Sequence, residues 1–259
     1  MSLRLGWQGP CETVTTACAA GTHGVANGAR AVATGVCDVV LAGASDASLV
    51  GTTIAGFTNA GAMTRTGVSR PFDAGRDGFA AGEGAALLLL EPLDAALARG
   101  ARVYAVVDGA ASGADAFHVT APSPGGRGAL ACMRRALDDA GLTAADVAHV
   151  NAHGTSTPLN DAAEATAVRA LLGERAVPVT SVKGVTGHGL GAAGALEAAA
   201  VCLSISSRTL PPTAGFVEGD DDTRWLDVVA GARPWEPGPV LSNSFGFGGH
   251  NGTLVISPV

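Results

Sequence analysis

The sequence predicts a layered α/β fold. Short aliphatic and β-branched stretches alternate along the chain with longer alanine-rich stretches whose apolar residues have helical spacing. Glycines follow several of the helical stretches, as expected of helix C-caps, at Gly35, Gly100 and Gly141. With 47% hydrophobic and only 15% charged residues, the 259-residue chain has ample material for a buried core.

The first elements predict a β-α-β unit. A strand over 12–16 leads into a helix over 18–34, which Gly35 ends, and a strand over 38–43 follows. The aliphatic run 85–91 predicts a further strand. At the N-terminus, the residues MSLRLGWQ resemble the end of a helix ahead of a Gly-Pro turn.

The second part of the chain contains more expected strands than the first. A helix over 93–99 ends at Gly100, and a helix over 128–140 ends at Gly141. Further helices are expected over 161–172 and 192–206. The expected strands are 103–110, 148–151, 179–181, 240–242 and 253–256. Two similar α/β halves follow from this pattern, with the first incomplete, and the stretch 118–127 is expected to form a surface loop.

Charge and cysteine content exclude several classes of protein. Sixteen basic against 23 acidic residues give a net charge of −7, which disfavours non-specific binding to nucleic acid or anionic membranes. The apolar run 84–90 is too short to span a bilayer. Five scattered cysteines, with no CxxC or HExxH motif, indicate reduced thiols in the cytoplasm and no structural zinc site.

Cys18 is the strongest candidate nucleophile. It lies in TVTTACAAGTHG, where the expected strand turns into the expected helix, so the positive end of the helix dipole is expected to stabilise its thiolate. A lone cysteine is more often a small buried residue, as expected for Cys37, Cys132 and Cys202. Cys11 precedes the strand and is expected to be structural.

Two histidines follow expected strands, where ligand sites of α/β sheets are usually found. His153 lies in NAHGTSTPLND, and His188 lies in SVKGVTGHGLGAAGA, five residues after Lys183. A single histidine in such a place is structural about as often as catalytic, but two with a lysine and a cysteine favour a site. The glycine-rich turn NSFGFGGHN, which includes Gly248, permits a close approach to the main chain.

Together these motifs resemble the β-ketoacyl-[acyl carrier protein] synthases. The resemblance rests on TACAAG, NAHGTSTPLND, SVKGVTGHGLGAAGALE, NSFGFGGHNG and SRPFDAGRDGFAAGEGAALLLLE, which cover the chain from Cys18 almost to its end. The second histidine makes the chain most similar to the elongating, synthase II type with a Cys-His-His triad. The resemblance implies a thiolase-like αβαβα layered fold of two pseudo-symmetric halves, an N-terminal half (1–91) with the nucleophile and a C-terminal half (92–259) with both histidines.

The resemblance also implies the chemistry. Cys18 would accept an acyl group, and malonyl-acyl carrier protein would then condense with it after decarboxylation, giving a 3-oxoacyl product. His153 and His188 would stabilise the enolate. The backbone amides of Cys18 and Phe247 would form the oxyanion hole, and Phe247 would gate the acyl pocket.

Supporting roles and partners follow from the same resemblance. Lys183, paired with Glu197, would orient the imidazoles, and the hydroxyls of Thr155 and Thr157 would bind the phosphopantetheine arm. No metal and no permanently bound cofactor are expected, because the phosphopantetheine belongs to the acyl carrier protein. The expected assembly is a homodimer or a ketosynthase heterodimer, in fatty acid or polyketide biosynthesis.

One departure from the family's pattern leaves alternatives open. Only 17 residues precede Cys18, fewer than in the family, so the chain is expected to be N-terminally truncated and its N-terminal half incomplete. A second interpretation is therefore an inactive or partner-dependent ketosynthase fragment or subunit that acts by association. A third is a cysteine hydrolase, which would leave Lys183, the second histidine and the phenylalanine turn unexplained.

Overall fold

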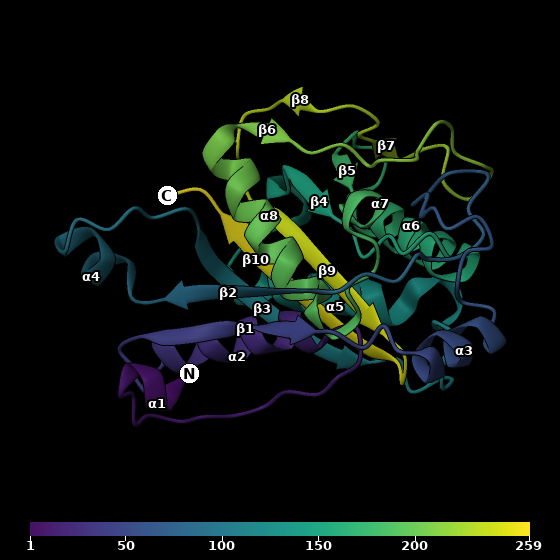
Figure 1. The fold of residues 1–259 in the computed structure, drawn as a ribbon. Coiled ribbons are helices and arrows are strands. Elements are labelled where there is room, and N and C mark those ends of the chain that lie inside the picture. The colour runs from purple at the N-terminus through teal and green to yellow at the C-terminus, as the bar shows by residue number, and fades with distance from the viewer.

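A six-stranded mixed sheet forms the centre of the molecule (Figure 1). In the computed structural model, which describes residues 1–259, β3, β10 and β9 are antiparallel, and β4, β5 and β7 continue the sheet in parallel with β9. The strands in spatial order are β3 (Val106–Ala114), β10 (His250–Ser257), β9 (Val240–Gly246), β4 (His149–Asn151), β5 (Pro178–Thr180) and β7 (Asp227–Val228). Because helices cover both faces of this sheet, its central strands are apolar on both sides.

Each face of the central sheet carries its own apolar core. On one face, α5 (Arg127–Asp139) and α6 (Pro158–Leu172) pack over Leu241 and Val255. On the other, α2 (Ala20–Ala33) and α8 (Ala193–Ser207) pack over Val240 and Leu254. Figure 1 shows α8 crossing β9 and β10. Successive residues of a strand point to opposite faces, which is why neighbouring residues of β9 and β10 belong to different cores.

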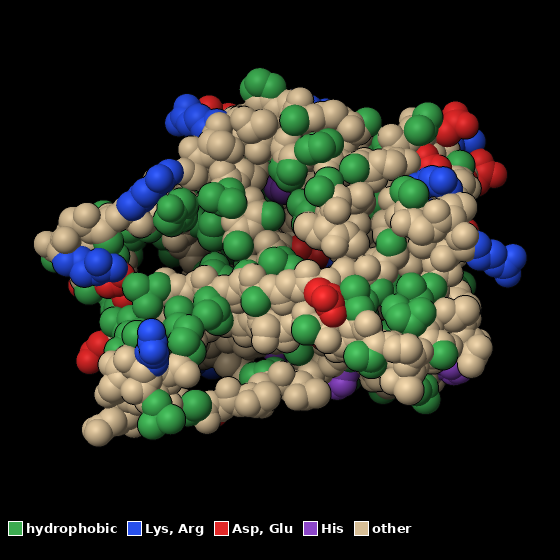
Figure 2. All heavy atoms as spheres, viewed as in Figure 1, with side chains coloured by type: hydrophobic (Ala, Val, Ile, Leu, Met, Phe, Trp, Pro, Cys, Tyr) green, Lys and Arg blue, Asp and Glu red, His purple; other side chains and the backbone are tan.

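A separate two-stranded antiparallel sheet lies on the outer side of α2 and α8. It consists of β1 (Val40–Asp46) and β2 (Gly84–Leu90). Leu88 and Leu90 of β2 pack onto the α2–α8 core, whereas Leu87 and Leu89 point outward and are 52% and 51% exposed. Hydrophobic side chains gather on this face of the molecule (Figure 2). The described chain thus forms four alternating layers: small sheet, helices, central sheet and helices.

Short elements complete the chain around these layers. They are α1 (Ser2–Leu5), α3 (Gly51–Asn59), α4 (Leu93–Ala98), α7 (Lys183–Thr186), the 3-10 helices Pro124–Gly126, Ala144–Asp146 and Leu190–Ala192, and the pair β6 (Thr209–Leu210) and β8 (Arg233–Pro234). The N-terminal helix α1 is exposed throughout. Of these elements, α3, α7 and the last 3-10 helix lie nearest to the site described below.

The layered α/β fold predicted from the sequence is confirmed, and most predicted elements form within a few residues of their expected bounds. The strand expected over 12–16 is wrong: these residues make only an isolated bridge, between Thr16 and Cys18, because no neighbouring strand offers them backbone partners. The expected β-α-β unit is consequently absent. Helix α3 was not predicted, since its few apolar residues form no buried stripe.

One segment has the length and composition of a membrane span. The window Leu190–Ser207 has a mean hydropathy of 1.5, but 56% of it is buried inside the protein. It consists mainly of α8, which packs between the two sheets. A core helix that is apolar all round has the same composition.

Candidate active site

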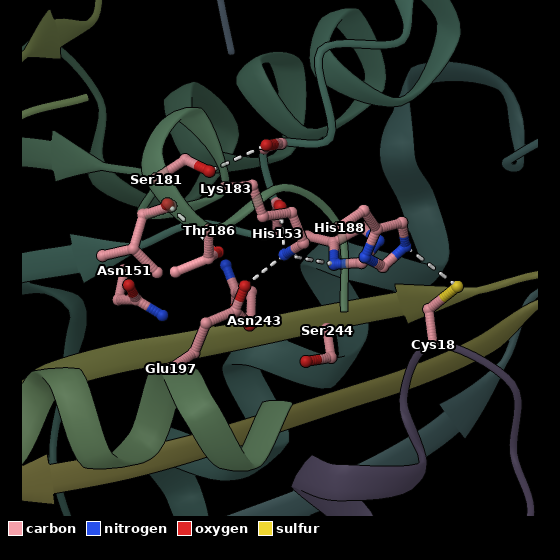
Figure 3. A network of polar contacts seen from close by, with 12 residues as sticks. Cys18, Asn151, His153, Ser181, Lys183, Thr186, His188, Glu197, Asn243 and Ser244 are labelled. Carbon is pink, nitrogen blue, oxygen red and sulfur yellow. Dashed lines mark hydrogen bonds and ion pairs between the residues drawn. The ribbon is translucent and has the colours of Figure 1, made fainter. Parts of the chain in front are cut away.

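Four segments that are distant in the sequence meet around one cavity of about 320 Å³. Cys18 precedes α2, His153 follows β4, His188 follows α7, and Phe247 lies in the turn between β9 and β10. Figure 3 shows the two imidazoles side by side, with the Cys18 sulfur at one end and Lys183 near the other. The structure therefore brings together the nucleophile and both histidines predicted from the sequence.

The Cys18 sulfur lies 3.1 Å from Nε2 of His188. Burial raises the pKa of the Cys18 thiol to about 11, and the opposing influences of Lys183 and of the backbone amides of Phe247 and Cys18 are smaller. The expectation of a helix-stabilised thiolate is therefore wrong for the free protein. Desolvation outweighs the dipole, because Cys18 is half-buried and lies two residues before the first residue of α2.

Both imidazoles are buried and neutral. Their ring centroids are 5.4 Å apart, with an interplanar angle of 83°. Burial lowers the pKa of His153 and of His188 well below the usual value, and the nearby Lys183 ammonium lowers both further. Neutral rings each keep one N–H, so each can donate one hydrogen bond without bringing a positive charge into the cavity.

Lys183 forms a buried ion pair with Glu197. Its Nζ also donates to the backbone oxygen of His153 at 2.6 Å and to Nδ1 of the same ring at 3.3 Å. Because Nδ1 accepts this hydrogen bond, the ring proton of His153 lies on Nε2. Burial raises the pKa of the Glu197 carboxyl to about 7, and the Lys183 ammonium opposes that rise.

The remaining predicted site residues line the same cavity. The backbone N–H groups of Cys18 and Phe247 both act to lower the pKa of the Cys18 thiol, and the Phe247 ring centroid lies 6.2 Å from that of Phe57. Thr155 and Thr157 also line the cavity, with their hydroxyl oxygens 2.8 Å apart. A substrate bound here would meet both aromatic rings and hydroxyl groups.

Two acidic residues of α6 that the sequence reasoning missed hold the His153 segment in place. Glu164 accepts the backbone N–H groups of His153 and Gly154, each at 2.8 Å, and Asp161 accepts that of Ser156 at 3.2 Å. Burial raises the pKa of Glu164 to about 7 and that of Asp161 to about 6. Their spacing of three on a predicted helix, directly after NAHGTSTPLN, is the signal that could have found them.

Aromatic contacts and a loop at the cavity were also missed. Phe79 lies edge-on against His188, with ring centroids 5.0 Å apart. The stretch 118–127, expected to be only a surface loop, contributes Thr120 and Ser123 to the cavity lining. Neither feature has a local sequence signal, because both depend on contacts between distant segments.

The other cysteines and histidines lie outside this arrangement. All five cysteines are free, and Cys132 is buried against β3. His149 is buried, with Nε2 2.8 Å from the Thr180 hydroxyl, and His23 bonds Thr16 and the backbone of Asn251. His118 is exposed.

Comparison with known sequences identifies the family to which the chain is related. Residues 1–96 match the family model "Beta-ketoacyl synthase, N-terminal domain", and residues 104–217 match "Beta-ketoacyl synthase, C-terminal domain". The 3-oxoacyl-[acyl-carrier-protein] synthase 2 of Synechocystis sp. is 43% identical over 98% of this chain. The alignment covers 63% of that relative, so the chain spans less than two thirds of the length of the curated relatives it matches.

Comparison with solved structures points to the same family. The ishigamide ketosynthase/chain length factor is 40% identical, with a TM-score of 0.91 over 96% of this chain and 61% of that one. A type II PKS ketosynthase bound to the hexaketide and in complex with its acyl-carrier protein is 33% identical, with a TM-score of 0.96 over all of this chain and 65% of that one. In sequence and in fold, the chain belongs to the β-ketoacyl synthase family.

Proposed function

We propose that this chain carries the active site of a condensing enzyme, which joins a cysteine-bound acyl group to malonyl-acyl carrier protein with loss of carbon dioxide. The observation that supports this most is the convergence of one thiol, two neutral imidazoles and two main-chain N–H groups on one cavity. A hydrolase needs only one imidazole beside the thiol. The second imidazole and its lysine partner favour condensation.

In the first step, the Cys18 sulfur attacks the carbonyl carbon of an acyl thioester. A bond forms between sulfur and carbon, and the bond to the carrier's sulfur breaks. The thiol proton passes to Nε2 of His188, the base in contact with the sulfur, and leaves with the carrier thiol. The backbone N–H groups of Cys18 and Phe247 bind the oxyanion.

In the second step, malonyl-carrier protein loses carbon dioxide, and its thioester oxygen becomes an enolate. His153 donates to this oxygen from Nε2, because Lys183 occupies Nδ1. The neutral His188 ring donates to the same oxygen from Nε2 once its single proton has moved there from Nδ1, because the acylated sulfur no longer gives a proton to Nε2. The enolate carbon attacks the acyl-cysteine carbonyl, a carbon–carbon bond forms, and the Cys18 thiolate leaves.

Lys183 and Glu197 set the charge around these rings. The ammonium keeps both imidazoles neutral and holds the His153 tautomer, while the carboxylate balances the ammonium in a buried position. Neutral donors suit the second step, because a protonated ring would give up its proton to the enolate and end the condensation.

The cavity fits a substrate delivered on a carrier arm. Thr155 and Thr157 offer hydroxyls to the amides of phosphopantetheine, and Phe247, which lines the cavity together with Cys18 and Phe57, would gate the acyl pocket. The phosphopantetheine arrives with the acyl carrier protein and is not a resident cofactor. A homodimer or a ketosynthase heterodimer in the cytoplasm is the corresponding assembly, and fatty acid or polyketide synthesis the corresponding pathway.

The test is a two-step assay with separate readouts. The chain is incubated with acyl-loaded carrier protein, and the adduct is located by mass spectrometry; malonyl-carrier protein is then added, and carbon dioxide and 3-oxoacyl product are measured. We expect an acyl group on Cys18 and a product two carbons longer. Free acid without a new carbon–carbon bond would instead indicate a hydrolase, and an acyl group on another cysteine would reject the assignment.

Two variants separate the roles of the residues. In His153→Ala, decarboxylation of malonyl-carrier protein should fall about a hundredfold or more, while acyl transfer to Cys18 falls much less. Cys18→Ala should lose acyl transfer completely. Equal loss of both steps in His153→Ala would contradict the role proposed for this ring.

A further inference from the structure

The glycine-rich segment 69–82, SRPFDAGRDGFAAG, contacts both histidine loops, and nothing in the proposed chemistry uses it. The first histidine loop is 153–157, after β4, and the second is 186–190, from the last residue of α7 to the first residue of the following 3-10 helix. The distance between the imidazoles depends on what ties the two loops together. Lys183 of α7 bonds to His153, and segment 69–82 forms hydrogen bonds with residues of both loops.

Its contacts with the first loop are hydrogen bonds that main-chain N–H groups of the segment donate. The N–H of Arg70 donates to the Ser156 hydroxyl at 2.8 Å, and the N–H of Gly78 donates to the Ser156 carbonyl at 2.9 Å. The N–H of Phe72 donates to the Asp161 carboxylate at 2.8 Å, which also accepts from Ser156. Ser156 is fully buried and has a positive φ of 73°, a strained conformation for a residue other than glycine.

Its contacts with the second loop involve His188 directly. The N–H of His188 donates to the carbonyl of Ala80 at 2.7 Å, and the N–H of Gly82 donates to the carbonyl of His188 at 2.9 Å. The ring of Phe79 packs edge-on against the imidazole. The segment is closed on itself by the Ser69 hydroxyl, which accepts the N–H of Ala80 at 2.9 Å.

The far side of the segment is anchored to the body of the protein. Arg76 pairs with Asp220 at 2.6 Å, and the carbonyl of Phe72 accepts the Thr223 hydroxyl at 2.7 Å. Asp73 accepts the N–H of Val217 at 2.8 Å. These bonds keep the segment from moving with either loop alone.

We infer that segment 69–82 is a clasp that sets the separation of the two imidazoles, and that Ser156 is the positioning residue through which it holds the His153 loop. The inference rests on the proposed function in that both rings must reach one thioester oxygen. A loosened clasp would leave the Cys18–His188 pair nearly intact but would misplace His153 against His188, and a misplacement of about 1 Å can cost on the order of a hundredfold in rate.

The test compares Ser156→Ala and Ser156→Gly with the wild-type chain. Both variants remove the hydroxyl that accepts from Arg70, but the glycine also relieves the strain of the positive φ. Ser257→Ala is the matched control, because Ser257 is a buried serine at the end of β10 whose hydroxyl has no partner.

Hydrogen exchange measured by mass spectrometry gives a readout independent of activity. We expect faster amide exchange in both variants at 69–82 and also at 186–190, where no residue has been changed, and no such effect in Ser257→Ala. Faster exchange confined to 153–157 would overturn the clasp.

The half-reactions give the second readout. Decarboxylation should fall about tenfold or more in both variants while acyl transfer to Cys18 changes less than about threefold. Equal loss of both steps, or full recovery in Ser156→Gly, would mean a role in stability alone and would overturn the inference. If the wild-type chain itself shows no decarboxylation, the proposed function fails, and hydrogen exchange still decides the clasp.

Discussion

At the scale of single residues, burial decides the ionisation of the site. The two imidazoles and the Lys183–Glu197 pair are buried and Cys18 is half-buried, and desolvation is the main cause of the pKa shifts of Cys18, both histidines and Glu197. The free site therefore holds a thiol beside neutral rings. In the proposed reaction, activation would come when the His188 nitrogen takes the thiol proton and the two N–H groups bind the new charge.

This ionisation predicts how alkylation of Cys18 depends on pH. A pKa of about 11 leaves the thiol protonated at neutral pH, so the rate of labelling by iodoacetamide should rise about tenfold per pH unit between pH 7 and 9. The labelled peptide is identified by mass spectrometry, with Cys18→Ala as the control. A rate that reaches a plateau below pH 8 would show a stabilised thiolate instead.

At the scale of elements, parallel strands β4 and β5 deliver the site and are themselves held by a buried histidine. His149 on β4 lies against the Thr180 hydroxyl on β5 and edge-on to the ring of Trp235. The positive charge of Arg233 adds to the effect of burial in lowering the pKa of His149. Burial lowers the pKa of His149 to about 3. The contacts between β4 and β5 therefore accommodate the His149 ring in its neutral form.

The stability of the β4–β5 pair should consequently depend on pH through His149. Its folded-state pKa lies below the unfolded value of 6.5, so the stabilisation is present above pH 6.5 and is lost as pH falls toward 3. Relative to His149→Gln, the wild-type free energy of unfolding should fall by about 1.4 kcal/mol per pH unit below 6.5. Urea titrations of both proteins between pH 7.5 and 5 measure this difference; a constant difference would contradict it.

At the scale of the whole molecule, the four layers leave one sheet face uncovered. Leu87 and Leu89 project from β2 onto this face, and Leu93 and Leu97 of α4 are also exposed. Leu87 and Leu89 give this sheet face an exposed apolar surface of the kind that marks an association site.

Self-association should therefore be reduced by charge on this face. Leu87→Glu together with Leu89→Glu should lower the average mass measured by sedimentation velocity at the same protein concentration, because like charges would face each other across any contact. Val217→Glu, at an 83% exposed valine in a distant loop, is the control and should leave the mass unchanged. An unchanged mass in the double variant would rule out this face as the contact.

Much of the fold and of the site could be predicted from the sequence. The spacing of apolar residues predicted the helices at α2, α5, α6 and α8, and capping glycines predicted the ends of α2 and α5, because these signals lie within a few residues of each other. The motifs around Cys18, His153 and His188 predicted which side chains would meet. The strand over 12–16 was not predictable, since a strand exists only where a neighbour completes its hydrogen bonds.

The sequence by itself determined the layered architecture, the family resemblance and the residues that converge. Only the tertiary structure decided that Cys18 is a neutral thiol, that His153 carries its proton on Nε2, and that segment 69–82 joins the two histidine loops. Local propensity and motif spacing are properties of neighbouring residues. Burial, pKa and contacts between loops instead depend on atoms that come from distant parts of the chain, and these meet only when it has folded.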